Sequence, residues 1–272
     1  ITILKANNKQ LPMNIIIPPD KTKGAKNGQK CIASITYWGD KHENPIGEII
    51  DILGDTGDNN TEMHAILAEF GLPYSYPQNL EEEANKIPEQ ISEEEISRRI
   101  DFRDTTTFTI DPVDAKDFDD ALSLRQVEEG VWEVGVHIAD VTYFVEQGSD
   151  IDKEAFKRAT SVYLVDRTVP MLPEHISNFI CSLRPDEEKL TYSCIFKLNN
   201  DAEVLDYKIA RTVIRSDRRF TYEEAQEIIE TGKGDFAMEI LTLNDLAKKL
   251  RDKRFASGAI AFERSEVRFE ID

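Results

Sequence analysis

The sequence predicts an α+β protein that begins with a small β-barrel. Short β-branched segments broken by glycines and prolines fill residues 1–79. From residue 105 onward, strand-like and helix-like segments are mixed without strict alternation, which favours α+β over a doubly wound sheet. An acidic stretch lies between these regions. We therefore expect a barrel domain at 1–79, an acidic helical linker at 80–104 and a mixed α+β domain at 105–272.

The N-terminal region has the pattern of a small OB-type barrel. Strand-like segments at 14–17, 30–37 and 47–53 are separated by glycine-containing turns. A short helix is predicted at 62–70, where Gly71 and a following proline supply a stop signal. Several short strands at this spacing predict a barrel closed by one helix.

The second region is predicted to form a sheet with helices that follow it. Expected strands are 105–110, 121–127, 131–141, 189–198 and 204–215, the last two pairing as a hairpin. Expected helices are 151–159, 221–230 and 235–255. Two helix starts have capping-box spacing, Ser92 with Glu95 and Thr221 with Glu224.

Composition excludes a membrane-spanning protein and gives a strongly acidic chain. The 33 lysines and arginines against 52 aspartates and glutamates leave a formal net charge of −19 at pH 7. No stretch approaches the roughly 20 consecutive apolar residues of a membrane span. Phosphate affinity comes mainly from lysine and arginine, so the balance argues against a general basic surface for nucleic acid. The first residues do not have the pattern of a secretory leader, and we expect a cytoplasmic protein.

Residues 111–120 carry the most informative pattern in the sequence. Five aspartates fall within these ten residues, in the predicted loop between two strands: Asp111, Asp114, Asp117, Asp119 and Asp120. Carboxylates at this density repel one another unless a cation lies between them, and their hard oxygen atoms suit Mg²⁺ or Mn²⁺. Val113 and Phe118 indicate a loop that is pinned against a core. The pattern predicts a divalent metal site.

Two familiar aspartate motifs do not fit this segment. An EF-hand needs glycine at the sixth loop position, where Leu122 or Lys116 stands, depending on the first aspartate. A phosphatase of the Asp-x-Asp-x-Thr type needs threonine where Ala121 stands. Both are excluded. An aspartate-rich surface turn and a glycosyltransferase Asp-x-Asp motif stay open.

The segment 109–123, TIDPVDAKDFDDALS, resembles the catalytic signature of the ribonuclease II / ribonuclease R family. Three further segments resemble that family in the same order, GVHIADV at 135–141, SVYLVDR at 161–167, and PMLPE running through to CSL at 170–183. Residues 1–79 are similar to the family's second cold-shock domain, an OB-type barrel. The ribonuclease R branch is the closer fit because its Asn-Pro-x-Gly-x-Ile and Leu-Gly-Asp patterns recur at 44–55.

The resemblance implies a hydrolytic, processive 3′-to-5′ exoribonuclease that releases nucleoside 5′-monophosphates from single-stranded RNA with Mg²⁺, Mn²⁺ being possible. Four aspartates match the family's catalytic and metal-binding positions: Asp111 and Asp120 as direct ligands, Asp117 in support, and Asp119 to orient or deprotonate water. Tyr163 matches the tyrosine that stacks on a terminal base. Asp114 is not a family position and is expected to face solvent, and His137 is expected to be structural.

The family's catalytic domain continues beyond the point where this sequence stops, so we expect a fragment with the second cold-shock domain and the N-terminal half of the catalytic domain. We expect this fragment to be weakly active or inactive, and monomeric. One alternative is a non-catalytic RNA-binding or regulatory module with a degenerate nuclease scaffold. Another is a Mg²⁺-dependent phosphodiesterase acting on DNA or nucleotides. The four intact aspartates favour the exoribonuclease.

Overall fold

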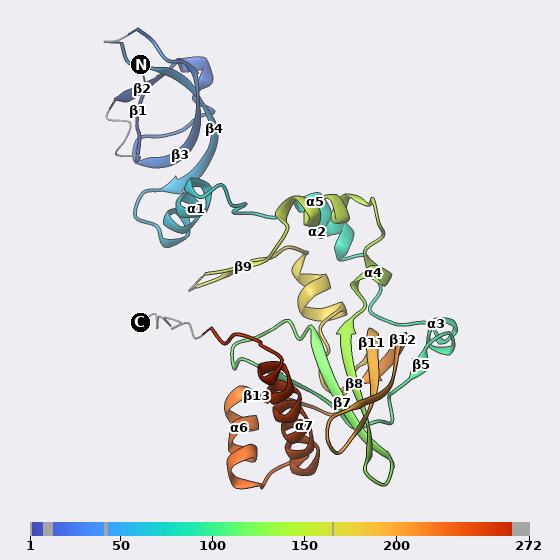
Figure 1. Ribbon diagram of the computed structural model, residues 1–272. Helices are drawn as coiled ribbons and strands as arrows, with labels where there is room; N and C mark the ends of the chain where they lie inside the picture. The colour runs from blue at the N-terminus through green and yellow to red at the C-terminus, as the bar shows by residue number, and fades with distance from the viewer. Residues whose placement is uncertain (1, 8–12, 41–42, 165, 263–272) are drawn as a thin grey trace. The chain divides into compact units, whose positions relative to one another are not determined.

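The computed structural model describes residues 2–7, 13–40, 43–164 and 166–262 (Figure 1). Contacts between residues divide the chain into two units, Ile1–Tyr76 and Pro77–Asp272. Both units combine strands with helices, which confirms the α+β prediction. No helix in the described ranges is long and apolar enough to cross a membrane.

The first unit is built on a four-stranded sheet in the order β1-β2-β4-β3. Its strands are β1 (Thr2–Lys5), β2 (Asn14–Ile17), β3 (Gln29–Tyr37) and β4 (Ile46–Asp55). The β2/β4 pair is parallel and the other two are antiparallel. Among the described residues β1 and β3 are open edges, so the predicted barrel is not closed. Ile15, Ile17 and Ile49 form its buried core. Gly47 is required here because a Cβ would lie 2.7 Å from the Ser34 carbonyl oxygen.

A short 3₁₀ helix, η1 (Pro19–Lys21), and helix α1 (Asn59–Glu69) complete the first unit. Helix α1 begins three residues before the predicted start because the Asp58 carboxylate accepts a hydrogen bond from the Thr61 amide at 3.0 Å. It ends at Glu69, and Gly71 just beyond its cap has a φ of +68°, which suits glycine.

The second unit contains a seven-stranded mixed sheet in the order β13-β6-β7-β8-β11-β12-β5. The strands are β5 (Ile100–Asp101), β6 (Thr107–Asp111), β7 (Asp120–Glu128), β8 (Val131–Ala139), β11 (Glu188–Asn199), β12 (Val204–Arg215) and β13 (Arg218–Thr221). The predicted hairpin of β11 and β12 is confirmed. The two edge strands, β5 and β13, pair in parallel with β12 and β6 and were not predicted.

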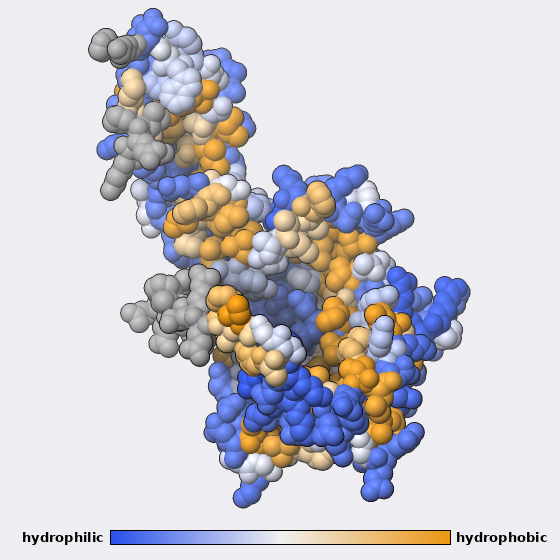
Figure 2. All heavy atoms as spheres, viewed as in Figure 1, coloured by the Kyte–Doolittle hydropathy of each residue, from blue (hydrophilic) through white to orange (hydrophobic). Residues whose placement is uncertain are grey.

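Helices α6 (Tyr222–Thr231) and α7 (Ala237–Ala256) lie side by side against this sheet (Figure 1). Their buried residues Ile228 and Ile240 pack on Phe108 and Phe220, and Leu246 packs near Leu124 and Val134. Both halves of the predicted capping box at Thr221 and Glu224 are present. The first half of β12 is exposed, including its apolar side chains Leu205 and Ile209, whereas Val213 and Ile214 in its second half are buried. Figure 2 shows hydrophobic atoms gathered over this part of the sheet.

Shorter elements join the remaining strands. They are α4 (Val141–Phe144), α5 (Asp150–Arg158), the hairpin of β9 (Val162–Tyr163) with β10 (Thr168–Val169), and the π-helix η2 (His175–Ile180). Helix α5 was predicted at 151–159 and ends at Arg158, where the cap residue Ala159 has a positive φ of 65°. The π-helix was not predicted.

The segment that precedes β5 forms α2 (Gln78–Ala84) and α3 (Glu93–Ser97). Leu80, Ala84 and Ile96 are buried. The Ser92 hydroxyl accepts from the Glu95 amide at 3.2 Å, but the Glu95 carboxylate pairs with the Arg99 guanidinium at 2.7 Å. The capping-box prediction at this helix is therefore half right.

His137 lies in the centre of the sheet and is fully buried. Its Nδ1 is 2.7 Å from the Ser193 hydroxyl and its Nε2 is 2.8 Å from the Ser123 hydroxyl. Burial lowers the pKa of His137 from its usual 6.5 to about 4. These contacts agree with the structural role predicted for this residue.

We expect His137 to make the fold acid-sensitive between about pH 6.5 and pH 4. In that range the unfolded chain takes up a proton that the folded chain excludes. The free energy of unfolding therefore decreases as the pH is lowered, by about 3 kcal/mol in all. The measurement is urea unfolding at pH 7 and at pH 4.5 for the wild type and His137→Gln. The difference between the two proteins should shrink as pH falls. A constant difference would contradict the prediction.

Candidate active site

The four aspartates matched in the sequence lie together at one end of two inner strands of the large sheet, β6 and β7. Asp111 ends β6 and Asp120 begins β7, and these two strands are antiparallel neighbours. Asp117 and Asp119 lie in the loop between them. The Asp119 carbonyl accepts a hydrogen bond from the Ala139 amide at 3.0 Å, which ties the end of the loop to β8.

Asp111 is the buried member of the group. It is 8% exposed, and its Oδ2 atom is buried without a hydrogen-bond partner. Removal from water raises the pKa of the Asp111 carboxyl, and the negative charges of Asp120 and Asp117 act in the same direction. A buried carboxylate oxygen with no donor is costly, so this atom is suited to receive a cation or a proton.

Asp119 remains accessible to solvent, but the surrounding chain removes part of its carboxyl from water. This partial burial, together with the charges of Asp117, Asp120 and Asp111, raises the pKa of Asp119 to about 6. A carboxylate that titrates near neutral pH can both accept and release a proton, which is the property of a general base.

The donor set has the chemistry of a Mg²⁺ or Mn²⁺ site. All four side chains offer carboxylate oxygens, which hard divalent cations prefer, and Oδ2 of Asp111 is buried without a hydrogen-bond partner among the described residues. Within the described part of the chain, no three side chains of His, Cys, Asp or Glu are arranged as a finished metal site. The residues therefore fit the ion by chemistry and by charge, and the structure shows no coordination geometry.

Tyr163 in β9 is brought to the same place from 46 residues away. Its hydroxyl donates to Asp117 Oδ2 at 2.8 Å, while the residue as a whole is 65% exposed. Partial burial and the hydrogen bond to Asp117 raise the pKa of Tyr163 to about 12. The tyrosine is thus a neutral donor at pH 7 whose ring is open to solvent. Val165, in the same segment, lies outside the described residues.

The segment after the π-helix forms hydrogen bonds with the backbone of the aspartate loop. The Ser182 hydroxyl accepts from the Phe118 amide at 3.0 Å and donates to the Lys116 carbonyl at 3.3 Å. The Leu183 amide donates to the Phe118 carbonyl at 2.8 Å. The predicted pinning of the loop is therefore confirmed at Phe118. It is wrong at Val113, which is 56% exposed.

Sequence reasoning missed Arg219. This half-buried residue of β13 donates through Nη2 to the Pro112 carbonyl, and its guanidinium carbon lies 5.4 Å from the centre of the Phe118 ring. Its positive charge opposes the rise in the pKa of Asp111. The Arg218-Arg219 pair is visible in the sequence, but only the parallel pairing of β13 with β6 brings it to the loop. Asp114 is exposed, as expected.

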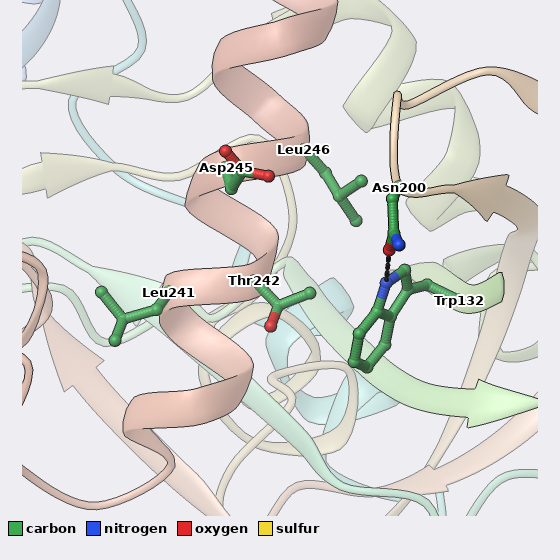
Figure 3. A pocket seen from close by; sticks show the side chains of 6 residues that line it. All are labelled: Trp132, Asn200, Leu241, Thr242, Asp245 and Leu246. Atoms are coloured by element: carbon green, nitrogen blue, oxygen red, sulfur yellow. Dashed lines mark hydrogen bonds between the residues drawn. The ribbon is translucent and has the colours of Figure 1, made fainter. Parts of the chain in front are cut away.

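The pocket shown in Figure 3 is a separate feature. It has a volume of about 270 Å³ and lies between α7, the start of β8 and the end of β11, where the Trp132 indole donates to Asn200 at 3.0 Å. Trp132 is near the start of β8, whereas Ile138, the residue paired with Asp120, is near its end. The pocket and the aspartates are thus at opposite ends of the sheet's strands.

Comparisons with known proteins identify both units. The family model for the RNB domain matches residues 99–272, and that for a cold shock domain matches residues 3–77. Ribonuclease R 1 of Lactococcus lactis is 34% identical over an alignment of 285 residues, gaps included. The alignment covers 100% of this chain and 34% of that protein. Human exosome complex exonuclease RRP44 is 35% identical over 281 residues, which cover 98% of this chain and 29% of that protein.

A solved structure shows the same fold. Mycoplasma genitalium RNase R in complex with double-stranded RNA matches with a TM-score of 0.86 and 25% identity, covering 96% of this chain and 47% of that one. The chain thus spans about a third of the length of these two curated relatives. The family resemblance and the cold-shock prediction are confirmed. With the RNB match covering well over half of its length, the chain belongs to the RNB domain family.

Proposed function

We propose that the protein to which these 272 residues belong is a hydrolytic, processive 3′-to-5′ exoribonuclease that releases nucleoside 5′-monophosphates from single-stranded RNA. The observation that carries the proposal is the cluster of four carboxylates at the ends of β6 and β7. It contains one buried oxygen without a partner, on Asp111, and one carboxyl whose pKa is about 6, on Asp119. The relatives named ribonuclease R and exonuclease support the reaction class.

The proposed cofactor is Mg²⁺, with Mn²⁺ as the possible substitute. We assign Asp111 and Asp120 as its direct ligands, because their backbones are fixed by pairing with Thr221 of β13 and Ile138 of β8, and Asp117 as a supporting ligand. When bound, the ion would neutralise charge on the scissile phosphate and lower the pKa of a bound water. The charge of four carboxylates is what makes a divalent cation favourable at this position.

The side chains of this chain would divide the remaining work. Asp119 accepts a proton from the attacking water, since its carboxyl is accessible and titrates near neutral pH. The Tyr163 hydroxyl holds Asp117 in one orientation, and the exposed ring provides a face on which a terminal base can stack regardless of its identity. We propose a monomer that works in the cytoplasm.

The 272 residues alone are expected to act slowly. Their net charge of −19 disfavours RNA binding, because phosphate affinity depends on lysine and arginine. Cleavage also requires the strand to be held in line with the metal, and a displacement of about 1 Å can cost on the order of 10²-fold in rate. This chain covers about a third of the length of these relatives. We propose that the rest of the whole protein supplies positive charge and further surface that holds the RNA strand.

The test is degradation of a 5′-labelled single-stranded RNA by the whole protein, with the 272-residue chain assayed in parallel. We expect stepwise shortening from the 3′ end, release of 5′-monophosphates, and complete loss of cleavage in EDTA that Mn²⁺ or Mg²⁺ restores. Release of the label in the first product, internal cuts or full activity in EDTA would each overturn the proposal. Tight RNA binding without any cleavage would favour the non-catalytic module.

A further inference from the structure

Arg219 contacts the aspartate loop at both of its ends. Nη2 donates to the carbonyl of Pro112, the residue that follows Asp111, and the guanidinium lies over the ring of Phe118, which precedes Asp119. The first contact holds the exit of β6 and the second holds the approach to β7. A single side chain thus spans the loop that carries the carboxylates.

The contacts follow from strand pairing. In the parallel register of β13 with β6, Arg219 lies beside Thr109 and Thr221 beside Asp111. Successive residues of a strand point to opposite faces, so Arg218 projects away from the loop. Arg218 pairs instead with Glu224 and Asp235 and stacks on Phe220. Two adjacent arginines are therefore separated in function by the pleat of one strand.

The positive charge of Arg219 lies close to the carboxylates of the aspartate loop. The neighbours that act electrostatically on Asp111 are the anions Asp120 and Asp117 and the cation Arg219. The Arg219 Nε atom is buried without a hydrogen-bond partner. A half-buried guanidinium that leaves a donor unsatisfied has a desolvation cost, so its retention needs a compensating interaction, and the carboxylate cluster supplies one.

We propose that Arg219 is a positioning residue that closes the aspartate loop and offsets its charge before any metal ion binds. Ser182 holds the same loop independently, through hydrogen bonds to the backbone of Phe118 and Lys116. The loop is thereby held at two points that the sequence places 37 residues apart. The importance of these Arg219 and Ser182 contacts for catalysis rests on the proposed function, whereas the contacts themselves do not.

The first arm of the test measures the loop directly. Hydrogen exchange is followed in peptides covering 112–119 in the metal-free 272-residue chain, for the wild type, Arg219→Gln, Arg219→Lys and the matched control Arg218→Gln. We expect about tenfold faster exchange in Arg219→Gln, since local opening is no longer opposed at one anchor. Arg219→Lys should lie between, because it keeps the charge and loses the planar fork. Arg218→Gln should match the wild type in 112–119, and exchange in β11 should be unchanged in all variants.

The second arm measures the consequence in the whole protein. Arg219→Gln should lower kcat for RNA shortening by about 10²-fold with KM within a factor of about three, because the carboxylates are misplaced and RNA binding is not altered. A fall in kcat with wild-type exchange in 112–119 would show that Arg219 contacts substrate, and would overturn a positioning role. Unchanged exchange and unchanged kcat would also overturn it.

The two arms separate this inference from the proposed function. If the wild-type whole protein does not shorten RNA, the proposed function fails, and the exchange arm still decides whether Arg219 closes the loop. If Arg219→Gln does not fold, the exchange rate in Arg219→Lys decides, since a lysine that gives full wild-type protection would overturn the requirement for the guanidinium.

Discussion

Replacing Asp119 by asparagine is expected to lower RNA shortening by the whole protein by about 10²- to 10⁴-fold, the range that a positioned general base contributes. The change is nearly isosteric, so the backbone hydrogen bond from Ala139 to residue 119 can persist. It removes the carboxyl whose pKa is about 6 and one negative charge from the cluster. RNA binding should be retained or slightly tighter, because repulsion of phosphate falls.

The loop offers a matched control for this substitution. Asp114→Asn makes the same chemical change five residues away at an exposed position, and it should leave the cleavage rate within a factor of about two, as surface substitutions usually do. Single-turnover cleavage of 5′-labelled RNA gives the rates, and fluorescence anisotropy in EDTA gives the binding. A wild-type rate in Asp119→Asn would remove this residue from the mechanism.

Arg99→Ala is expected to destabilise the second unit by about 3–5 kcal/mol, the usual cost of breaking a buried ion pair from one side. Arg99 is 8% exposed, and its Nη1 lies 2.8 Å from the Asp140 carboxylate, which is buried as well. The same guanidinium pairs with Glu95 and lies over the Tyr143 ring. Removing it leaves Asp140 buried with the more distant Arg211, at 3.6 Å, as its one remaining cation in the described part of the chain.

Arg98→Ala is the control for this prediction. Arg98 has the neighbouring position on the chain, but its side chain is 66% exposed and its partner Glu94 is also exposed, so the loss should be at most about 1 kcal/mol. Urea unfolding followed by Trp132 fluorescence reports the second unit when Trp38 of the first unit is replaced by phenylalanine. Equal losses in the two arginine variants would show that the Asp140 pair contributes little.

The sequence by itself determined the elements whose signals are local. β-branched alternation identified β6, β7, β8 and the β11/β12 hairpin, and the side chains of Thr221 and Glu224 formed the capping box that their spacing predicted. It also predicted that four carboxylates would lie together between two strands, because ten consecutive residues cannot lie far apart. The structure places Asp111 and Asp120 at the facing ends of β6 and β7, and only Asp117 and Asp119 in the loop. The family match followed from the same residues.

The tertiary structure decided which distant residues join those carboxylates. Tyr163 reaches Asp117, Ser182 reaches Phe118, and Arg219 reaches Pro112 through contacts that span 46 to 107 residues. The edge strands β5 and β13 are two and four residues long, too short to carry a periodic pattern. Such strands form only because a neighbouring strand supplies their hydrogen bonds, and a partner of that kind is set by the path of the whole chain.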